Sequence, residues 1–238
     1  MSLLELEGVG RRFGGLRAVD EVSFEVEQGQ IRGLIGPNGA GKSTLFSLIA
    51  GSIRPSSGHI RYGSRDVTGW TPHEAAAAGV ARTFQLMRVF SSMTVLQNLV
   101  VGGYLRHRRR SEARARALEV LEMVGLAEQA DTPARSLTVA SKKRLEIARA
   151  LATGPQLLLL DETLSGLTPV EGREAVEVVR QINASGVTIV MVEHVMEVVM
   201  PLCDRVVVLN HGRLIREGTP AEVTQDQAVI EAYLGIRR

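Results

Sequence analysis

A glycine-rich stretch at residues 36–44 has residue types and a spacing that suit phosphate binding. It reads Gly-Pro-Asn-Gly-Ala-Gly-Lys-Ser-Thr and fits the pattern G-x-x-x-x-G-K-[ST]. Glycines let successive backbone N–H groups point into one concavity, and the helix expected to follow offers its positive end to the same anion. Lys42 adds a compact charge at the β and γ phosphates, and Ser43 supplies a hydroxyl ligand for Mg²⁺. The predicted nucleotide-binding residues of this loop are Asn38, Gly39, Ala40, Gly41, Lys42, Ser43 and Thr44.

The lysine of this loop is unusual for the chain. Among the 28 lysines and arginines, only Lys42, Lys142 and Lys143 are lysine. The wide planar guanidinium of an arginine would not fit a loop that wraps closely around phosphate. Lysine at position 42 of an arginine-rich chain therefore supports a phosphate-binding role.

Two acidic residues, Asp161 and Glu162, follow an apolar run at residues 157–160. Ligands gather at the carboxyl ends of the strands of an α/β sheet, so these carboxylates are expected beside the phosphate loop. Asp161 is predicted to hold Mg²⁺, usually through water, and Glu162 to polarise the attacking water. Taken alone, the pair would more simply open a loop, and the phosphate loop weighs against that interpretation.

A histidine follows another apolar run. Residues 187–192 end in Glu193 and His194, and an imidazole at this place can donate a hydrogen bond to a γ phosphate. A histidine after a buried strand is more often an ordinary loop or capping residue. By itself, this position is a weak indication of function.

The elements that position these residues follow from the hydrophobic pattern. Residues 3–7 and 18–27 alternate apolar and polar side chains, which predicts half-buried, antiparallel strands. Residues 31–35, 157–160 and 187–192 are apolar runs of strand length, and the last two are typical of strands buried on both faces of a parallel sheet. The other expected elements are a helix at 45–50, a helix through Val176, Val179 and Ile182, and a hairpin at 210–212.

The middle of the chain differs from both ends. From residue 94 to 153 no convincing strand is found, and apolar residues recur at helical spacing. We therefore expect a single domain over 1–238, with a helical lobe at about 86–153 inserted in the nucleotide-binding core. The two expected helical stripes consist of Leu118, Leu121 and Val124, and of Leu145, Ala148 and Leu151.

Composition restricts the class of protein. With 238 residues, 45% of them hydrophobic, the chain is long enough to bury a large core. A single cysteine, Cys203, excludes an internal disulfide and fits a reducing compartment. No apolar run approaches the roughly 18 residues that span a bilayer, and the N-terminus does not read as a signal peptide, so we expect a cytoplasmic protein. A net charge of +2 gives no general electrostatic argument for a nucleic acid partner.

Taken in order, these motifs resemble those of ABC-type ATPases over essentially the whole chain, from Phe13 to the C-terminal helix. The resemblance implies an α/β fold, a P-loop NTPase core with an antiparallel β subdomain and an inserted helical lobe, and it implies ATP and Mg²⁺ as cofactors. It assigns Gln85 to the glutamine loop, which reaches Mg²⁺ and water, and His194 to the switch histidine that senses the γ phosphate. Phe13 falls where the family stacks an aromatic ring on adenine, and Val19 is expected at the same edge. A strand-end core aromatic is the alternative interpretation for Phe13.

The signature segment departs from the family pattern. Where the family has L-S-G-G-Q, residues 137–141 read Leu-Thr-Val-Ala-Ser. Thr138 keeps a hydroxyl and Ala140 a small side chain, so a helix N-terminus that faces the partner's γ phosphate is feasible. Lys142 and Lys143, which follow, are interpreted as a solvated face. The residues expected to act on the partner's ATP are Thr138, Val139, Ala140 and Ser141.

Within the family, residues 11–19 and 81–90 look like the ATPases of high-affinity branched-chain amino-acid importers, as does the ending at 217–235. The resemblance implies two ATPase subunits, identical or different, that face each other head to tail and hold each ATP between them. It further implies integral membrane permease subunits, an indirect link to a solute-binding protein, and no nucleic acid partner. The expected location is the inner face of the cell membrane, reached through the permease subunits.

Three alternatives stay open at this point. Related ATPases serve urea, other amides or lipopolysaccharide export. A soluble ABC ATPase of DNA repair or translation usually has two cassettes or a long coiled-coil insertion, and this chain shows neither. A regulatory subunit that binds ATP without hydrolysing it is disfavoured by Asp161, Glu162 and His194, while the divergent residues 138–141 keep it open.

Overall fold

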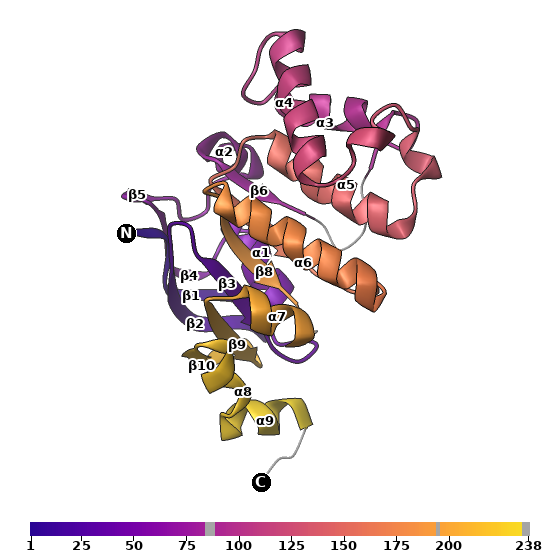
Figure 1. Cartoon of the computed structure of the whole chain (residues 1–238). Coiled ribbons are helices and arrows are strands. Elements are labelled where there is room, and N and C mark those ends of the chain that lie inside the picture. Colours follow the sequence, from indigo (N-terminus) through magenta and orange to yellow (C-terminus); the bar gives the residue numbers. More distant parts are fainter. Residues whose placement is uncertain (84–88, 194–195, 235–238) are drawn as a thin grey trace.

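Two β-sheets with helices packed against them form the structure, a computed structural model that describes residues 1–83, 89–193 and 196–234 (Figure 1). A smaller antiparallel sheet includes the N-terminal strands, and a larger, mostly parallel sheet follows. Helices separate the parallel strands of the larger sheet along the chain, which confirms the predicted α/β class.

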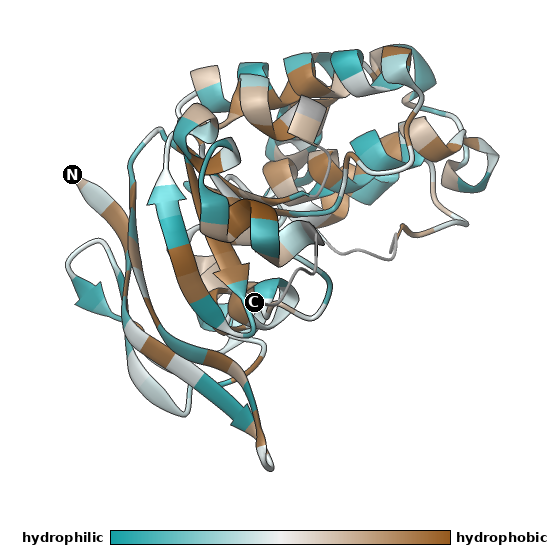
Figure 2. Ribbon diagram, turned by 90° about the horizontal axis from the view of Figure 1, so that it is seen from below, coloured by the Kyte–Doolittle hydropathy of each residue, from teal (hydrophilic) through white to brown (hydrophobic). Residues whose placement is uncertain are grey.

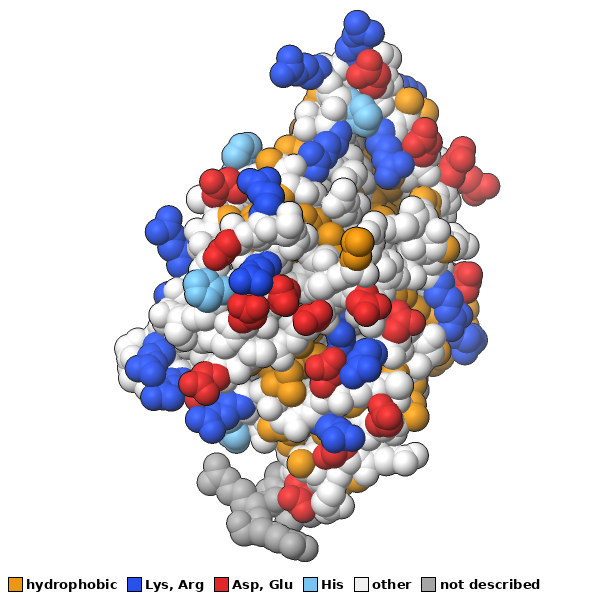
Figure 3. Space-filling view, turned by 90° about the vertical axis from the view of Figure 1, so that its left-hand side faces the viewer, with side chains coloured by type: hydrophobic (Ala, Val, Ile, Leu, Met, Phe, Trp, Pro, Cys, Tyr) orange, Lys and Arg blue, Asp and Glu red, His pale blue; other side chains and the backbone are white. Residues whose placement is uncertain are grey.

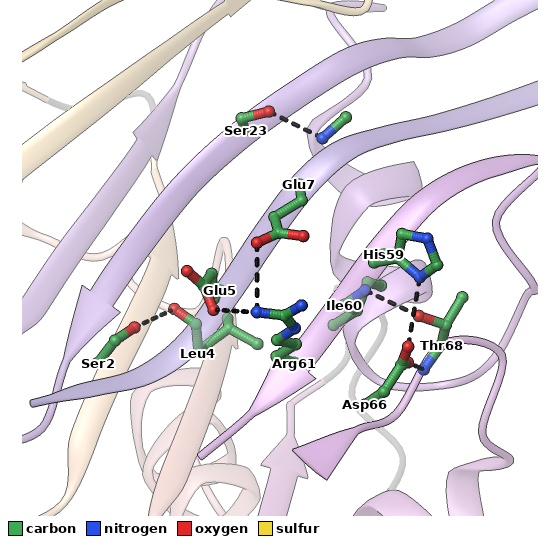
Figure 4. Close-up of polar contacts among 11 residues, drawn as sticks. Ser2, Leu4, Glu5, Glu7, Ser23, His59, Ile60, Arg61, Asp66 and Thr68 are labelled. Carbon is green, nitrogen blue, oxygen red and sulfur yellow. Dashed lines mark hydrogen bonds and ion pairs between the residues drawn. The ribbon is translucent and has the colours of Figure 1, made fainter. Parts of the chain in front are cut away.

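The antiparallel sheet has the strand order β2-β1-β4-β5. Figure 2 shows hydrophobic and hydrophilic residues alternating along these strands, as expected when successive side chains point to opposite faces. On the more exposed face, Arg61 Nη1 lies 3.7 Å from a Glu5 oxygen and 3.5 Å from a Glu7 oxygen (Figure 4). The predicted pair of antiparallel strands is confirmed. The strands are β1 (Ser2–Phe13), β2 (Leu16–Glu27), β4 (Ser57–Tyr62) and β5 (Arg65–Asp66).

The larger sheet has the order β10-β9-β3-β8-β7-β6, and its strands are parallel except for β10. Every residue of β3, β7 and β8 is buried, which confirms the interpretation of the three apolar runs. The predicted hairpin is also present, and its turn places His211 and Gly212 at φ 47° and 80°. The strands are β3 (Ile31–Ile35), β6 (Val80–Arg82), β7 (Leu157–Asp161), β8 (Thr188–Val192), β9 (Arg205–Asn210) and β10 (Arg213–Gly218).

Helix α1 (Lys42–Ile49) lies between the two sheets. Its Phe46 belongs to the same buried cluster as Leu6 of β1 and Leu159 of β7. Leu158 and Leu160 belong instead to the cluster on the opposite face of the larger sheet, where α6 packs. The other helices of the core are α2 (Pro72–Ala78), α6 (Pro169–Ala184), α7 (Met196–Leu202), α8 (Pro220–Thr224) and α9 (Gln227–Leu234).

Among the described residues between β6 and β7, the chain forms three α-helices: α3 (Val95–Gly103), α4 (Arg110–Met123) and α5 (Val139–Ala152). Short 3-10 turns at Ala127–Gln129 and Ala134–Ser136 connect α4 to α5. One expectation for this region is wrong, because Leu118 is 38% exposed. Ala117, one position earlier, is fully buried, since a step of one residue turns a helix by about 100°. The stripe that α4 buries is Ala113, Ala117, Val120 and Leu121.

The surface shows no strong bias of charge on the side of the antiparallel sheet. Figure 3 shows acidic and basic side chains interspersed over this face. Within residues 1–83, 89–193 and 196–234, no helix is both long enough and apolar enough to span a bilayer.

Candidate nucleotide-binding site

A groove of about 520 Å³ lies where the end of the β1–β2 hairpin meets the loop between β3 and α1. Glu162, directly after β7, and His211, in the β9–β10 turn, line the same groove. Parallel strands end at one edge of the sheet, and this brings together segments that are far apart in the sequence. The lining residues are Phe13, Leu16, Arg17, Ala18, Asn38, Gly39, Ala40, Gly41, Lys42, Ser43, Thr44, Glu162 and His211.

The loop between β3 and α1 is shaped for an anion. Gly41 has φ +102°, and a Cβ at this position would lie 2.3 Å from the Ala18 carbonyl oxygen, so only glycine fits. Helix α1 begins directly after it, with no side-chain cap and no acidic residue in its first turn. The first N–H groups of the helix and its positive dipole end are therefore open to a bound phosphate.

Lys42 is held inside this loop. Its Nζ donates hydrogen bonds to the Gly36 carbonyl at 2.6 Å and to the Pro37 carbonyl at 3.0 Å. Burial lowers the pKa of Lys42, while the nearby Glu162 and Asp161 carboxylates act in the opposite direction. A phosphate beside Nζ would likewise favour the charged ammonium form of this lysine.

Asp161 and Ser43 have oxygen atoms that suit a divalent cation. Asp161 is only 3% exposed, and its Oδ2 accepts a hydrogen bond from Arg82 Nη2 at 2.7 Å. Its Oδ1 is buried and has no hydrogen-bond partner among the described residues. Ser43 is exposed and lines the groove. A buried carboxylate oxygen that needs a partner and a hydroxyl are both hard donors of the kind that Mg²⁺ binds, so these residues fit that ion.

Glu162 has a strained backbone. Its φ is +50°, in the left-handed region that non-glycine residues rarely adopt. The amide N–H of Glu162 donates to the Val192 carbonyl at 3.0 Å, which anchors the turn to β8. Strain of this kind, about 1–3 kcal/mol, persists where the surrounding structure enforces it and is common at functional sites. Here it accompanies a carboxylate that lines the groove.

Phe13 and Val19 differ in their relation to the groove. Phe13 ends β1, is 44% exposed, lines the groove, and has the Arg11 guanidinium 4.6 Å from its ring centre. It is therefore not a buried core aromatic. Val19 is only 1% exposed and belongs to the core between the sheets, so its expected place at the groove is corrected. Successive side chains of a strand alternate in direction, and Ala18 lines the groove instead.

Comparison with known proteins agrees with this geometry. The family model described as ABC transporter matches residues 19–165, and the one described as branched-chain amino acid ATP-binding cassette transporter matches residues 213–237. The high-affinity branched-chain amino acid transport ATP-binding protein LivG of Salmonella typhimurium is 41% identical, with 98% of each chain covered. BraF of Pseudomonas aeruginosa, which has the same description, is 39% identical, again with 98% of each chain covered.

Solved structures agree as well. A nucleotide-free ATP-binding cassette from an ABC transporter has a TM-score of 0.91 and 30% identity, and the match covers 100% of both chains. The dimeric, post-hydrolysis structure of another cassette, bound to ADP and Pi, has a TM-score of 0.81 and 25% identity over 91% of this chain and 98% of that one. This chain belongs to the ABC transporter family. It is an ATP-binding ATPase subunit whose hydrolysis of ATP powers transport.

Two predicted site residues of this ABC ATPase lie outside the described residues. Gln85 falls in the segment 84–88 and His194 in the segment 194–195. Their roles stay predictions. The residues that precede these segments are described: Thr83 Oγ1 accepts a hydrogen bond from the Asp161 amide at 3.0 Å, and Glu193 is buried.

The divergent signature segment begins helix α5 in a regular way. Thr138 is the N-cap, and its hydroxyl accepts a hydrogen bond from the Ser141 amide at 3.1 Å. Val139 is 57% exposed, so its β-branched side chain disturbs no packing in this chain. None of residues 138–141 lines the groove around Lys42. The segment thus keeps an ordered helix N-terminus that is separate from this chain's own phosphate loop.

Lys143 requires a correction, because it is not part of a solvated face. Its Nζ donates a hydrogen bond to the Ser165 carbonyl in the loop after β7. Burial lowers the pKa of Lys143, and the carboxylate of Glu193 is the largest influence in the other direction. Glu193 in turn accepts hydrogen bonds from the Leu164 amide at 2.8 Å and from Ser165 Oγ at 3.2 Å. Helix α5 is therefore tied to the residues that follow β7 and β8.

Sequence reasoning also missed groove residues. His211, Arg17 and Ala18 line the groove, and none of them was among the predicted site residues. The sequence did contain a signal for His211. It follows the apolar strand β9, whose carboxyl end reaches the same sheet edge as that of β7. No comparable signal existed for Arg17 and Ala18, whose approach depends on how the two sheets pack.

Proposed function

We propose that this ABC ATPase powers an importer of branched-chain amino acids. Support comes from the description of the LivG and BraF relatives and from the match at residues 213–237, outside the common ATPase motifs. The observation that carries the nucleotide part is the single groove in which the phosphate loop, Phe13 and Glu162 meet.

For hydrolysis we propose that Ser43, Asp161 and Gln85 hold Mg²⁺, directly or through water. The ion would neutralise charge on the phosphates and keep them in line for attack. Lys42 contacts the β and γ phosphates, and Glu162 accepts a proton from the attacking water. His194 senses the γ phosphate. The strained backbone of Glu162 supports its assignment as the base, because it fixes the carboxylate at the groove.

For nucleotide recognition we propose that adenine stacks on the exposed ring of Phe13, while the N–H groups of residues 38–44 bind the phosphates. The γ phosphate then faces the signature segment of a second ATPase subunit, identical or different. In that segment, Thr138, Val139, Ala140 and Ser141 present the N-terminus of α5. Its intact N-cap and its separation from the groove of its own chain support a role in trans.

For coupling we propose that residues 86–153 move as a helical lobe and transmit closure on ATP to the permease subunits. The complex would sit on the cytoplasmic face of the membrane and act indirectly with a solute-binding protein. The contact between Lys143 and the Ser165 carbonyl supports transmission, because it links α5 to the loop after β7, which contains Glu162.

The test compares wild type with Glu162→Gln in two assays. In purified protein, we expect the rate of ATP hydrolysis to fall about 10²- to 10⁴-fold, with ATP affinity within about twofold of wild type. In cells with equal protein levels, uptake of labelled leucine, isoleucine and valine should be lost. Glu128→Gln is the matched control, because Glu128 is exposed and does not line the groove.

Two results would count against the proposal separately. A wild-type hydrolysis rate in Glu162→Gln would remove its role as the base. If the variant loses hydrolysis but uptake of all three amino acids is unchanged, the ATPase serves another solute.

A further inference from the structure

Arg82 has no role in the mechanism proposed above, yet its side chain contacts residues of the site. It is the last residue of β6, and its side chain is only 13% exposed. Its Nη2 donates to Asp161 Oδ2 at 2.7 Å, and its Nη1 donates to Ser47 Oγ at 3.0 Å. The guanidinium also lies 5.8 Å from the ring centre of Phe46 on α1. One partly buried cation therefore connects the carboxyl end of β7 to helix α1.

The connection continues to the start of α1. Ser47 Oγ donates a hydrogen bond to the Ser43 carbonyl at 2.7 Å. A hydroxyl can accept one hydrogen bond and donate another, so the chain from Asp161 through Arg82 and Ser47 to Ser43 is consistent in every donor and acceptor. The two ends of this hydrogen-bonded chain, Asp161 and Ser43, are the residues whose oxygen atoms suit a divalent cation.

We propose that Arg82 is a positioning residue for Mg²⁺, because it holds the Asp161 carboxylate and the first turn of α1 in one fixed arrangement. This inference rests on the proposed metal roles of Ser43 and Asp161. Arg82 engages Oδ2 alone and leaves the buried Oδ1 without a protein partner among the described residues, available to the ion or its water. The neighbouring Thr83 hydroxyl accepts from the Asp161 amide, so β6 fixes both the backbone and the side chain of this residue.

The geometry requires an arginine. A planar guanidinium presents donors in a rigid fork and reaches two acceptors on different elements at once. A lysine at position 82 would pair with one carboxylate through a single point of contact, and it would not also hold Ser47. Residues that orient metal ligands in this way typically contribute about 10- to 100-fold to metal affinity.

The experiment measures Mg²⁺ binding without relying on turnover. A fluorescent ATP analogue is bound to the full-length protein, first in EDTA and then during a titration with Mg²⁺. In Arg82→Gln, we expect the Mg²⁺ concentration for half-maximal tightening to rise about 10-fold or more. Affinity for the analogue in EDTA should stay within about twofold, because the phosphate loop is untouched. Arg82→Lys should restore part of the loss.

A matched control removes a similar ion pair elsewhere. Arg32 Nη1 lies 2.7 Å from Glu217, and the Arg32 side chain is 4% exposed. Arg32→Gln should lower the unfolding temperature without changing the Mg²⁺ titration. If Arg82→Gln does not fold, Ser47→Ala removes the link to α1 more gently and should still raise the required Mg²⁺ concentration about two- to threefold.

The outcomes separate this inference from the proposed function. In the wild type, Mg²⁺ should tighten binding of the ATP analogue, and Asp161→Asn should abolish this tightening. If Mg²⁺ does not tighten binding in the wild type, the proposed metal site itself is contradicted. If Asp161→Asn loses the effect while Arg82→Gln and Ser47→Ala titrate like wild type, the positioning role of Arg82 is wrong. Equal losses with and without Mg²⁺ would also overturn it, because they indicate a general structural role.

Discussion

Truncation of Phe13 tests whether the groove binds adenine as well as phosphate. Stacking of a base on an aromatic side chain contributes about 1–3 kcal/mol, which corresponds to about 5- to 150-fold in the dissociation constant. The Arg11 guanidinium lies over the Phe13 ring at 4.6 Å, and the residue is 44% exposed. We therefore expect Phe13→Ala to weaken ATP binding by about 5- to 30-fold, the lower part of that range.

The assay compares ATP with inorganic tripolyphosphate as competitors of a fluorescent ATP analogue. Tripolyphosphate has no base, so its affinity should be the same in wild type and in Phe13→Ala, while that of ATP falls. Because the ring is 44% exposed in the folded protein, its removal should change the unfolding temperature little.

Phe90 offers a closely matched control. It is 41% exposed, has the Arg149 guanidinium 4.6 Å from its ring centre, and does not line the groove. Phe90→Ala should therefore leave ATP affinity unchanged. If Phe13→Ala binds ATP like wild type, or loses ATP and tripolyphosphate equally, adenine does not stack on this ring.

Three further predictions concern the loop, the cysteine and a helix cap. Gly41→Ala should reduce ATP affinity at least about tenfold, since its φ is +102° and the new Cβ would meet the Ala18 carbonyl. Burial raises the pKa of the Cys203 thiol to about 12, so a thiol reagent at pH 8 should react about a thousandfold more slowly with the folded protein than in urea. The hydrogen bond from the Thr168 amide lowers the pKa of Glu171. The stability that this cap contributes is therefore present above the ordinary carboxylate pKa and is lost as pH falls through the lowered value. The difference in unfolding temperature between wild type and Glu171→Gln should shrink below about pH 4.

Each of the three has a clear contrary outcome. Gly63 has φ +57°, and no atom lies within 4 Å of the position that a Cβ would take, so Gly63→Ala should affect stability but not ATP affinity. Equal ATP affinity in Gly41→Ala and Gly63→Ala would refute the close approach to Ala18. A fast reaction of Cys203 in the folded protein would refute its burial. A stability difference at Glu171 that is constant from pH 7 to 3 would refute the charge-dependent cap.

Much of the fold could be predicted because the information is local. The alternation in β2 and the uniform burial of β3, β7 and β8 follow from strand periodicity, and the structure confirms them. The phosphate loop could be placed for a similar reason, since its glycines, its lysine and the start of α1 lie within nine consecutive residues. Asp161 and Glu162 were predictable at the same edge because parallel strands end together.

Errors occurred where one residue step changes the direction of a side chain. Val19 was expected at the groove and Leu118 in the core, and each is displaced by its neighbour, Ala18 and Ala117. Apolar residues that recur at strand or helix spacing indicate that the element has a buried face. The exact orientation of that face depends on the bulge or the helix rotation that packing selects.

The sequence by itself determined which chemistry this protein carries: a phosphate loop with Lys42 and Ser43, and a carboxylate pair at the end of a buried strand. Only the tertiary structure decided which distant groups act on that chemistry. Arg82 meets Asp161 and Ser47, and Lys143 meets the Ser165 carbonyl, across separations that no periodicity encodes. The physical reason is that local spacing sets the direction of a side chain, whereas its partner is set by the packing of whole sheets and helices.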